Sequence, residues 1–289
     1  MIVVVGSVNL DTVIHVDHVP RTGETVIATD RHLNPGGKGA NQAVAAARLG
    51  AEVVFIGCVG DDDAGRDLRS GLIDEGVDCS LLETVDGPSG SATVMVDREG
   101  DNAIVVAEGA NGRVVIDTPH TAALRSATAV LCQLEIPLGA AGAALAMAGG
   151  HAVLNAAPSR VLPPDIVSAT DVLIVNEIEL ADLAGGIDPQ AVRSLGVPTV
   201  VATLGGDGAQ VITPGDVVYV PAPSVTVRDT TGAGDAFCGA FAWALDAGFD
   251  AHDAAARGVV AGSLATTGIG ARTAMPKRTS VDRMLRSGS

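Results

Sequence analysis

The sequence predicts an α/β fold in three layers, α/β/α, with a mostly parallel central sheet and a small β-sheet lid. Short runs of β-branched residues alternate with alanine-rich helical patterns, which is typical of parallel strands joined by crossover helices. Hydrophobic residues make up 47% of the chain and aromatic residues 2%, as expected for aliphatic strands buried under tightly packed helices. Four further strand-like segments lack intervening helices, and these are assigned to the lid.

The predicted main sheet runs through most of the chain. Its strands are expected at 2–5, 53–56, 129–132, 152–154, 172–175 and 199–202. A hairpin is expected at 210–213 and 217–220, followed by helices at about 233–247 and 252–267. The length fits one large α/β unit with a small appendage, so residues 1–289 are interpreted as a single domain.

The predicted lid comes from two separate parts of the chain. Strands are expected at 12–16, 25–30, 91–97 and 103–107, with a turn at 98–101 between the last two. The lid is therefore contributed by about 12–34 and 90–108. It is expected to form a small sheet at the edge of the main domain.

Charge and composition exclude several classes of partner. The formal net charge is −16, and the chain holds one Trp, one Tyr and four Phe, which argues against nucleic acid and anionic membranes. No apolar run approaches the 18 or so residues of a membrane span, and no signal-peptide pattern is seen. The four cysteines show no C-x-x-C pair and are interpreted as buried thiols in a reducing compartment. A cytoplasmic protein is expected.

The segment Asp229-Thr-Thr-Gly-Ala-Gly-Asp-Ala-Phe is a glycine-rich turn that leads directly into an apolar helix. Backbone N–H groups at Gly232, Ala233 and Gly234 are expected to be free at the positive end of the helix dipole, which favours a bound anion. Asp235 would then lie beside a transferring phosphoryl group, where a general base is needed. The alternative is that Asp235 is only an acidic residue of the first helical turn.

A second glycine-rich segment, Asn34-Pro-Gly-Gly-Lys-Gly-Ala-Asn-Gln-Ala, opens another alanine-rich helix. Its paired glycines allow a substrate to approach the backbone, while Lys38 and Asn41 offer hydrogen bonds. The spacing fits neither a Walker loop nor a dinucleotide-binding fingerprint.

Together these two segments resemble the signature regions of the ribokinase-like (PfkB) family of carbohydrate kinases. Further similar blocks span the chain: Gly6-Ser-Val-Asn-Leu-Asp, Gly60-Asp-Asp-Asp-Ala-Gly, Gln133-Leu-Glu-Ile-Pro, Asn176-Glu-Ile-Glu and Thr203-Leu-Gly-Gly-Asp-Gly. The resemblance implies the ribokinase-like fold and ATP-dependent phosphorylation of a primary hydroxyl of a small sugar. The pattern is most similar to the ribokinase branch, which implies D-ribose as substrate and ribose 5-phosphate as product.

The resemblance also implies a sugar site between the main sheet and the lid, with Asp235 as the base. The sugar-binding residues would be Asn9, Asp11, Gly36, Gly37, Lys38, Asn41, Glu135 and Asp235. Asp11 could instead hold a local turn, and Glu135 could cap the next helix. Ala92 and Val94 are weaker candidates for apolar contact with the sugar ring.

For the nucleotide, the resemblance implies that Asn176 and Glu179 organise Mg²⁺ through water and orient the phosphates of ATP. Thr203, Gly205, Gly208 and Gly234 would form the nucleotide-binding turns. An acidic first turn that complements the helix dipole is the alternative for Glu179. A site for a monovalent cation, K⁺, would include Asp229, Thr231, Ala265, Gly268, Gly270 and Ala274.

The sequence departs from the ribokinase branch at several places. Val259 stands where a small polar residue often faces adenine, and Ala274 stands where serine is frequent in the cation site. The stretch between Asn176 and Thr203 is shorter than is usual in that branch. These departures put K⁺ activation and the choice of ribose in question.

Two other functions stay open at this point. One is a kinase for another acceptor, such as fructose, a deoxyribose or a nucleoside, although the scarcity of aromatic residues argues against nucleoside stacking. The other is a non-catalytic sugar-binding regulator, against which the intact Asp235 and its glycines argue. A homodimer is also expected, because an uncovered apolar lid face would otherwise be exposed to water, and relatives in the family often cover it with a second lid.

Overall fold

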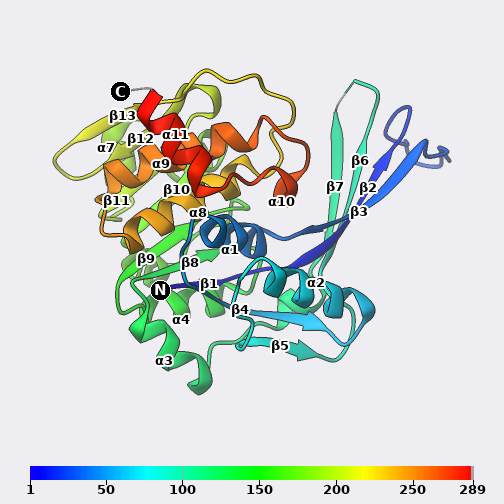
Figure 1. The fold of residues 1–289 in the computed structure, drawn as a ribbon, viewed down its shortest axis with the longest axis horizontal. Helices are drawn as coiled ribbons and strands as arrows, with labels where there is room; N and C mark the ends of the chain where they lie inside the picture. Colours follow the sequence, from blue (N-terminus) through cyan, green and yellow to red (C-terminus); the bar gives the residue numbers. More distant parts are fainter. Residues whose placement is uncertain (100, 288–289) are drawn as a thin grey trace.

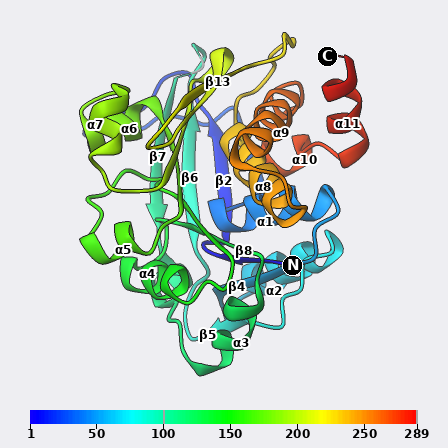
Figure 2. The same cartoon turned by 90° about the vertical axis from the view of Figure 1, so that its left-hand side faces the viewer.

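A large sheet between two layers of helices, with a separate small sheet, forms the architecture of this computed structural model (Figures 1 and 2) and confirms the predicted fold class. The structure describes residues 1–99 and 101–287, so Gly100 of the predicted 98–101 turn lies outside the described residues. The strands are β1 Ile2–Val5, β2 Asn9–His15, β3 Asp30–Gly36, β4 Val53–Gly60, β5 Leu82–Val85, β6 Ser91–Val96, β7 Asn102–Ala107, β8 Ala129–Gln133, β9 His151–Asn155, β10 Val172–Asn176, β11 Thr199–Thr203, β12 Gly208–Ile212 and β13 Val217–Pro221. The α-helices are α1 Lys38–Arg48, α2 Asp63–Asp74, α3 Thr118–Ser126, α4 Leu138–Ala146, α5 Pro164–Ser168, α6 Glu177–Ala184, α7 Pro189–Arg193, α8 Ala233–Asp246, α9 Ala251–Ala265, α10 Ala271–Ala274 and α11 Arg278–Ser287.

The strand order of the main sheet places a topological switch at its first strand. Within the described residues the order is β13-β12-β11-β10-β9-β8-β1-β4-β5, and the strands from β11 to β5 are parallel. The final hairpin of β12 and β13 is antiparallel to its neighbours. Strand β1 lies between β4 and β8. The strands of this sheet that follow β1 in the sequence are therefore added first on one side of it, as β4 and β5, and then on the other side, from β8 onward. Ligands of open α/β sheets bind outside the carboxyl ends of strands at such a point.

The two faces of the sheet bury two separate halves of the hydrophobic core. Along β1, Ile2 and Val4 pack toward α1, α8 and α9, whereas Val3 and Val5 pack toward α3 and α4. All four side chains are fully buried. A strand covered on both faces has no need of polar alternation, which explains why the sequence there is continuously apolar. Figure 2 shows the helical layers on either side of the sheet.

The lid is a four-stranded sheet that projects from the body (Figure 1), with the order β3-β2-β6-β7. The strand expected at 25–30 is wrong: the strand that pairs with β2 is Asp30–Gly36. It contains a proline and a glycine, and its first six residues are exposed, so it shows no apolar alternation. An edge strand tolerates both features, because half of its backbone groups need no partner strand. Strand β5, also at an edge, was not expected.

No helix in the described part of the chain is long and apolar enough to cross a membrane.

Candidate active site

Polar residues gather in a cavity at the carboxyl ends of the parallel strands. Asn155, Asn176 and Thr203 end β9, β10 and β11, and all three line the cavity. Lys38 at the start of α1 and Asp235 in the first turn of α8 line it from the other side. The remaining lining residues are Ala157, Ile174, Val175, Glu179, Gly232, Gly234 and Cys238. The cavity thus lies outside the carboxyl ends of the parallel strands, on the β9 to β11 side of the switch at β1.

Asp235 is buried at the base of this cavity, with 9% of its surface exposed. One carboxylate oxygen accepts a hydrogen bond from Asn41 Nδ2 at 2.9 Å, and the other accepts one from Gln42 Nε2 at 3.1 Å. The side chain is therefore held by amides of α1 and makes no capping bond to its own helix. This contact favours a functional carboxylate over a simple first-turn acid.

The turn before α8 depends on Gly232. Its φ of 77° lies in the left-handed region, and a Cβ atom there would lie 2.8 Å from Cα of Ala271. Gly232 and Gly234 line the cavity, as an anion site would require. The structure differs from expectation at Ala233, whose N–H donates to the carbonyl of Thr230 at 3.2 Å and is not free for an anion.

Close packing of α1 on α8 brings the amides to Asp235. A Cβ atom on Gly239 would lie 2.5 Å from both the Ala45 Cβ and the Gln42 carbonyl oxygen. The absent side chain lets the two helices approach one turn beyond Asp235. The packing of the two helices therefore determines the distance between the amides of α1 and the Asp235 carboxylate.

A chain of buried amides continues from Asp235 into the sheet. Gln42 Nε2 also donates to Asn155 Oδ1 at 3.0 Å, while Gln42 Oε1 accepts from Gln133 Nε2 at 2.7 Å. Asn155 in turn donates to the carbonyl of Ile174 at 3.2 Å. Hydrogen bonds between buried amides restrict how these side chains can turn, although the buried Gln133 Oε1 has no partner among the described residues. The orientation of Asp235 is thus tied to β8, β9 and β10.

Burial and neighbouring charges set the ionisation of the cavity. Burial raises the pKa of Asp235, and the charge of Lys38 and the hydrogen bonds from Asn41 and Gln42 oppose that rise. For Lys38, burial acts to lower the pKa, but attraction to Asp235, Glu135 and Glu179 outweighs it, and the pKa is raised. A raised carboxyl pKa suits a group that must accept a proton near neutral pH.

The opposite wall of the site is built around Glu135. Its carboxylate accepts hydrogen bonds from Ser7 Oγ at 2.5 Å and from the Lys38 N–H at 3.0 Å. These contacts join the ends of β1, β8 and the start of α1. The side chain therefore does not simply cap α4, which begins with no side-chain cap. Gly37 makes the close approach possible, since its φ is 85° and an added Cβ would lie 2.8 Å from the Cα of Val8.

Asp11 and Asn9 lie on β2, where the lid leaves the body. The Asn9 Oδ1 accepts from Asn111 Nδ2 at 2.6 Å, so part of its hydrogen-bonding capacity is used within the protein. Asp11 lies against Gly36, whose added Cβ would be 1.9 Å from Asp11 Oδ2, and its buried Oδ1 has no hydrogen-bond partner among the described residues. Burial, helped by the charge of Glu135, raises the pKa of Asp11 to about 6. An unpartnered buried acceptor of this kind fits a ligand hydroxyl.

Asn176 and Glu179 form a reciprocal capping box at the start of α6. The Glu179 N–H donates to Asn176 Oδ1 at 2.8 Å, and the Asn176 N–H donates to Glu179 Oε2 at 2.9 Å. Local helix capping, one of the two interpretations of the sequence, is thus present. Both residues also line the cavity, and burial raises the pKa of Glu179. Carboxylate and amide oxygens at this position fit the ligand preference of hydrated Mg²⁺.

A second cavity of about 420 Å³ adjoins the first, and the two share Thr203 and Gly234. Gly205 and Gly208 line it after β11. Position 208 requires glycine, because its φ is 109° and an added Cβ would lie 2.0 Å from the carbonyl oxygen of Val220. Val259 and Phe237 give it an apolar wall. Its volume falls in the range of small-molecule pockets.

The residues expected at the cation site form two groups: Asp229 with Thr231 and Gly270, and Gly268 with Ala265 and Ala274. The Asp229 carboxylate accepts from the N–H groups of Thr231 at 2.9 Å and Gly270 at 2.7 Å, and these bonds lower its pKa although burial acts to raise it. A Cβ on Gly268 would lie 2.7 Å from the Ala274 Cβ and 3.9 Å from the Ala265 carbonyl oxygen. A carboxylate beside backbone carbonyls suits a hard monovalent cation, but both Asp229 oxygens already hold the loop together.

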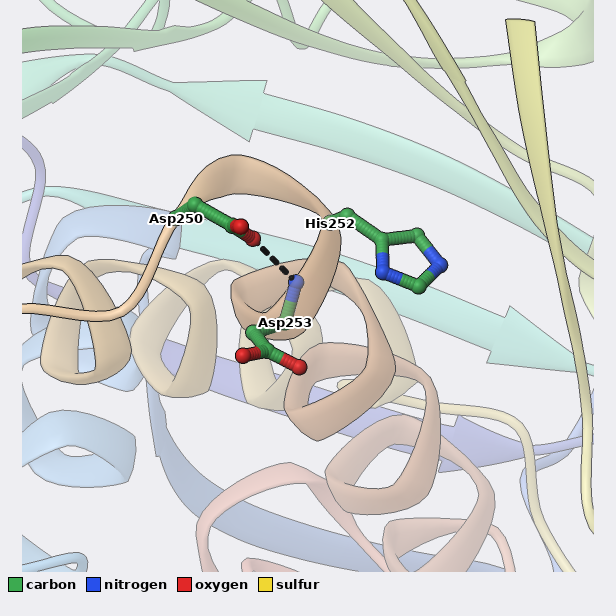
Figure 3. Close-up of side chains that lie close together, drawn as sticks. All are labelled: Asp250, His252 and Asp253. Atoms are coloured by element: carbon green, nitrogen blue, oxygen red, sulfur yellow. Dashed lines mark hydrogen bonds between the residues drawn. The ribbon is translucent and has the colours of Figure 1, made fainter.

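Another group of side chains with metal-binding chemistry lies outside these cavities (Figure 3). Asp250, His252 and Asp253 are exposed at the start of α9. The Asp250 carboxylate accepts from the Asp253 N–H at 2.8 Å and so caps the helix. Helix capping accounts for Asp250, and the Asp253 carboxylate lies 3.8 Å from Arg257 Nη1.

Six buried polar residues of the site were not predicted from the sequence. They are Ser7, Gln42, Gln133, Asn155, Arg272 and Asn111, the last being the buried partner of Asn9. Gln42 could have been found, since it follows Asn41 in the glycine-rich segment and a polar residue in an alanine-rich buried helix face needs a partner. Ser7 and Gln133 lie in the blocks Gly6-Ser-Val-Asn-Leu-Asp and Gln133-Leu-Glu-Ile-Pro but were not singled out there, and the others carry no local pattern.

Comparison with known proteins finds similarity over nearly the whole chain. The family model of pfkB family carbohydrate kinases matches residues 1–278. A ribokinase of Haemophilus influenzae is 36% identical over 292 residues, covering 95% of each chain. The crystal structure of a Thermotoga maritima ribokinase superimposes with a TM-score of 0.92 at 33% identity and covers 99% of each chain. An Arabidopsis thaliana ribokinase complexed with ribose and ATP gives a TM-score of 0.91 at 33% identity, covering 99% of this chain and 98% of its own.

Proposed function

The chain belongs to the pfkB family of carbohydrate kinases, and from this premise we propose that it transfers the γ-phosphoryl group of ATP to a primary hydroxyl of D-ribose. The product is ribose 5-phosphate. Residues 1–289 act as one kinase domain with the four-stranded lid over the acceptor. The observation that carries the proposal is the buried Asp235 carboxylate, held by Asn41 and Gln42 in a cavity that adjoins a larger pocket.

In this proposal Asp235 is the general base. Each of its oxygens accepts one hydrogen bond from α1, and a carboxylate has further lone pairs for an acceptor hydroxyl. As the proton moves to Asp235, the hydroxyl oxygen forms a bond to the γ-phosphorus, and the bond from that phosphorus to the oxygen of ADP breaks. Lys38, Gly232 and Gly234 face the same cavity, where positive charge and backbone dipoles stabilise the phosphate oxygens.

The acceptor occupies the wall formed by Asn9, Asp11, Gly36, Gly37, Lys38, Asn41 and Glu135. The unpartnered Asp11 Oδ1 and the Glu135 carboxylate accept hydrogen bonds from sugar hydroxyls. Lid closure over this wall excludes water and suppresses hydrolysis of ATP. A polar wall of this composition favours a small sugar over a nucleoside, which would need a flat apolar surface for its base.

ATP binds across the two cavities, with adenosine beside Val259 and the phosphates toward Asp235. Asn176 and Glu179 would hold Mg²⁺, which would supply positive charge to the phosphate oxygens. K⁺ would be held by Asp229, Thr231 and the backbone carbonyls around Gly268. The donor set supports this assignment, and the capping and loop bonds that the same side chains make are compatible with it.

Two chains associate through their lids, and the enzyme works in the cytoplasm. Strand pairing places Ile104 and Val106 on one face of the lid and Leu33 and Val105 on the other. Each of the four is more than half exposed, and this apolar surface supports a lid that a second chain covers in part. Four free, buried cysteines support a reducing compartment.

The decisive experiment is a screen of acceptors with ATP, in which ADP release is coupled to an optical signal. D-ribose is tested beside fructose, 2-deoxyribose and adenosine, with and without K⁺, and the product is identified by phosphorus NMR. Preference for ribose with phosphate on the 5-hydroxyl supports the proposal. Faster turnover of another acceptor reassigns the substrate. Sugar binding without ADP release would instead identify a non-catalytic regulator.

A further inference from the structure

Arg272 is a buried arginine beside the proposed base, and the mechanism above does not use it. It lies in α10 and exposes 6% of its surface. Arginine is seldom buried to this extent unless it is fully paired. Its Nε donates to Asn41 Oδ1 at 3.0 Å, and a terminal nitrogen donates to the Gly36 carbonyl oxygen at 2.8 Å. The guanidinium therefore joins the first turn of α1 to the last residue of the lid strand β3.

The contact with Arg272 decides how the Asn41 amide is oriented. A guanidinium only donates hydrogen bonds, so the amide oxygen of Asn41 must face Arg272. The amide nitrogen then faces Asp235, to which it donates at 2.9 Å. If the amide turned over, it would direct its oxygen at the carboxylate and its N–H groups at a cation. Arg272 thus fixes the donor that holds one oxygen of Asp235.

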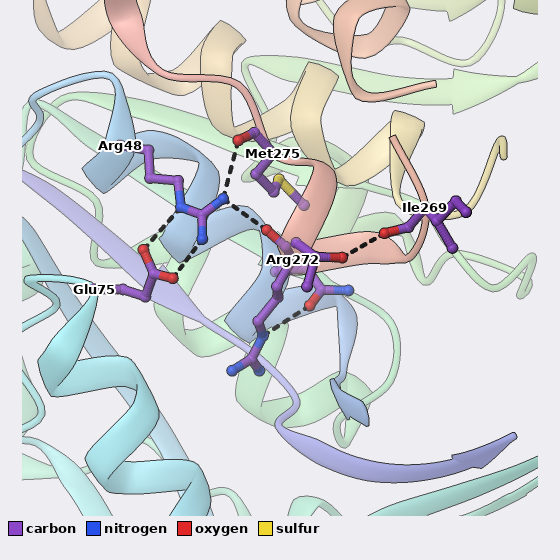
Figure 4. Close-up of polar contacts among 7 residues, drawn as sticks. Arg48, Glu75, Ile269, Arg272 and Met275 are labelled. Atoms are coloured by element: carbon purple, nitrogen blue, oxygen red, sulfur yellow. Dashed lines mark hydrogen bonds and ion pairs between the residues drawn. The ribbon is translucent and has the colours of Figure 1, made fainter. Parts of the chain in front are cut away.

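The backbone of Arg272 is itself held from the outside of the molecule (Figure 4). Arg48 donates to the carbonyl oxygens of Arg272 at 2.7 Å and Met275 at 2.9 Å. Glu75 orients Arg48 through two hydrogen bonds of 2.8 and 2.5 Å. Planar arginine and carboxylate groups paired in this way have little freedom. The side chain of Arg272 therefore extends into the site from a rigid support.

Charged groups on several elements face this guanidinium. Burial lowers the pKa of Arg272 to about 10, Asp11, Glu75 and Asp235 act against the decrease, and Arg48 contributes to it. The group remains a cation at neutral pH. From the other side, Asp235 faces Lys38 and Glu135. Loss of the Arg272 charge leaves Lys38 as the remaining cation among these neighbours of Asp235.

We propose that Arg272 is a positioning residue, which holds the Asn41 and Asp235 pair in its reactive orientation and ties it to Gly36 at the base of the lid. This inference rests on the proposed function, because an orientation is reactive only if Asp235 is the base. Arg272 acts through Asn41 and makes no direct hydrogen bond to Asp235 in the structure.

Three variants test the proposal. Arg272→Met removes the charge and the hydrogen-bond donors, whereas Arg272→Lys keeps the charge but not the planar guanidinium that donates to Asn41 and Gly36 at once. Arg257→Met is the matched control. Arg257 is a partly buried arginine stacked on the Phe249 ring at 3.6 Å, outside the network. The measurements are kcat and KM for ribose between pH 5 and 9, the thermal midpoint, and the titration of the Asp235 carboxyl by carbon NMR, assigned with Asp235→Asn.

Arg272→Met is expected to lower kcat about 100-fold, the order of loss for a misplaced catalytic group. The acid limb of its pH profile moves to higher pH, because a cation near Asp235 is lost. Arg272→Lys keeps the position of the acid limb but recovers only part of kcat, and Arg257→Met matches the wild type in both. If Arg272→Met does not fold, Arg272→Lys decides: wild-type kcat in that variant overturns the proposal.

A folded Arg272→Met protein with the wild-type pH profile and wild-type kcat per folded molecule also overturns it, since Arg272 is then only structural. The NMR titration separates this inference from the proposed function. If no acceptor is phosphorylated but the Asp235 titration moves to higher pH in Arg272→Met, the function is wrong and the coupling of Arg272 to Asp235 stands. If the Asp235 titration in Arg272→Met stays at its wild-type position, Arg272 and Asp235 are not coupled.

Discussion

The Asn41 amide nitrogen lies 2.9 Å from a carboxylate oxygen of Asp235, although 194 positions separate the two residues in the chain. Each belongs to a different glycine-rich segment at the start of a helix. Their contact brings the two motifs together in one site, in which the proposed acceptor wall lies beside the proposed base. The following predictions test the parts of that site.

Asp235→Asn is expected to lower kcat by about 10²- to 10⁴-fold, because the amide cannot accept the hydroxyl proton. Binding of ribose, measured by calorimetry without ATP, should change little. Asp246→Asn, at the other end of α8, is the control and should keep wild-type kcat. Near-normal turnover in Asp235→Asn would show that another group is the base.

Gly239→Ala is expected to reduce both stability and kcat. The new methyl group meets the Gln42 carbonyl and the Ala45 side chain at 2.5 Å, so α1 and α8 must separate. Overpacking of this kind costs about 1 to 3 kcal/mol, measured by urea unfolding. Gly71→Ala in α2 is the matched control, since an added Cβ there has no neighbour within 4 Å. Equal stability of the two variants would contradict the tight contact.

The KM for ribose is expected to rise as the pH falls through about 6. Burial and Glu135 raise the pKa of Asp11 to about 6, and below that value the side chain no longer offers two carboxylate acceptors. Steady-state kinetics from pH 5 to 8 give the profile. In Asp11→Asn the KM should be higher and nearly independent of pH over this range. A step of equal size in that variant would assign the titration to another group.

Asp11 also predicts a change of stability with pH. The native state binds the proton of Asp11 more tightly than the unfolded chain, in which Asp titrates near pH 3.9. As the pH rises from about 4 to 6, the unfolded chain has lost this proton while the native state still holds it. The contribution of Asp11 to the free energy of unfolding therefore decreases as the pH rises through this window. Asp11→Asn should therefore gain up to about 3 kcal/mol relative to the wild type as the pH rises through this window. Urea unfolding at pH 4 and pH 7 measures the difference, and a constant difference would refute the raised pKa.

Glu179→Gln is expected to increase the Mg²⁺ concentration needed for half-maximal turnover, because a charged oxygen near the phosphates is lost. The amide oxygen can still accept the Asn176 N–H, so the helix cap and the thermal midpoint should be retained. Glu177→Gln is the control, since Glu177 is exposed and does not line the cavity. An unchanged Mg²⁺ requirement would leave Glu179 with a capping role alone.

Most of the main sheet could be predicted because its strands are continuous aliphatic runs, as at Ile2–Val5. The lid was harder. Strand β3 holds Pro35 and Gly36 and buries little, so neither its composition nor its periodicity indicates a strand. Its position is set by pairing with β2, from Asn9 opposite Gly36 to His15 opposite Asp30, and this pairing is a long-range property of the fold.

The glycine-rich segments could be identified because close backbone approach requires glycine at known places, such as Gly232 and Gly37. The partners of the site could not. Arg272 lies in a short helix without an apolar pattern, and only the folded chain brings it to Asn41. Gln133 and Asn155 end separate strands, and their amides meet Gln42 because β8 and β9 are adjacent.

Helix α1 contacts both halves of the site within little more than one turn. The N–H of Lys38 donates to Glu135, and the side chains of Asn41 and Gln42 donate to Asp235. A helix has a fixed rise of about 1.5 Å per residue, so α1 keeps a constant distance between the proposed acceptor wall and the proposed base. Redesign of the enzyme for longer or shorter acceptors should therefore begin at lid positions such as Ala92, with helix α1 left unchanged.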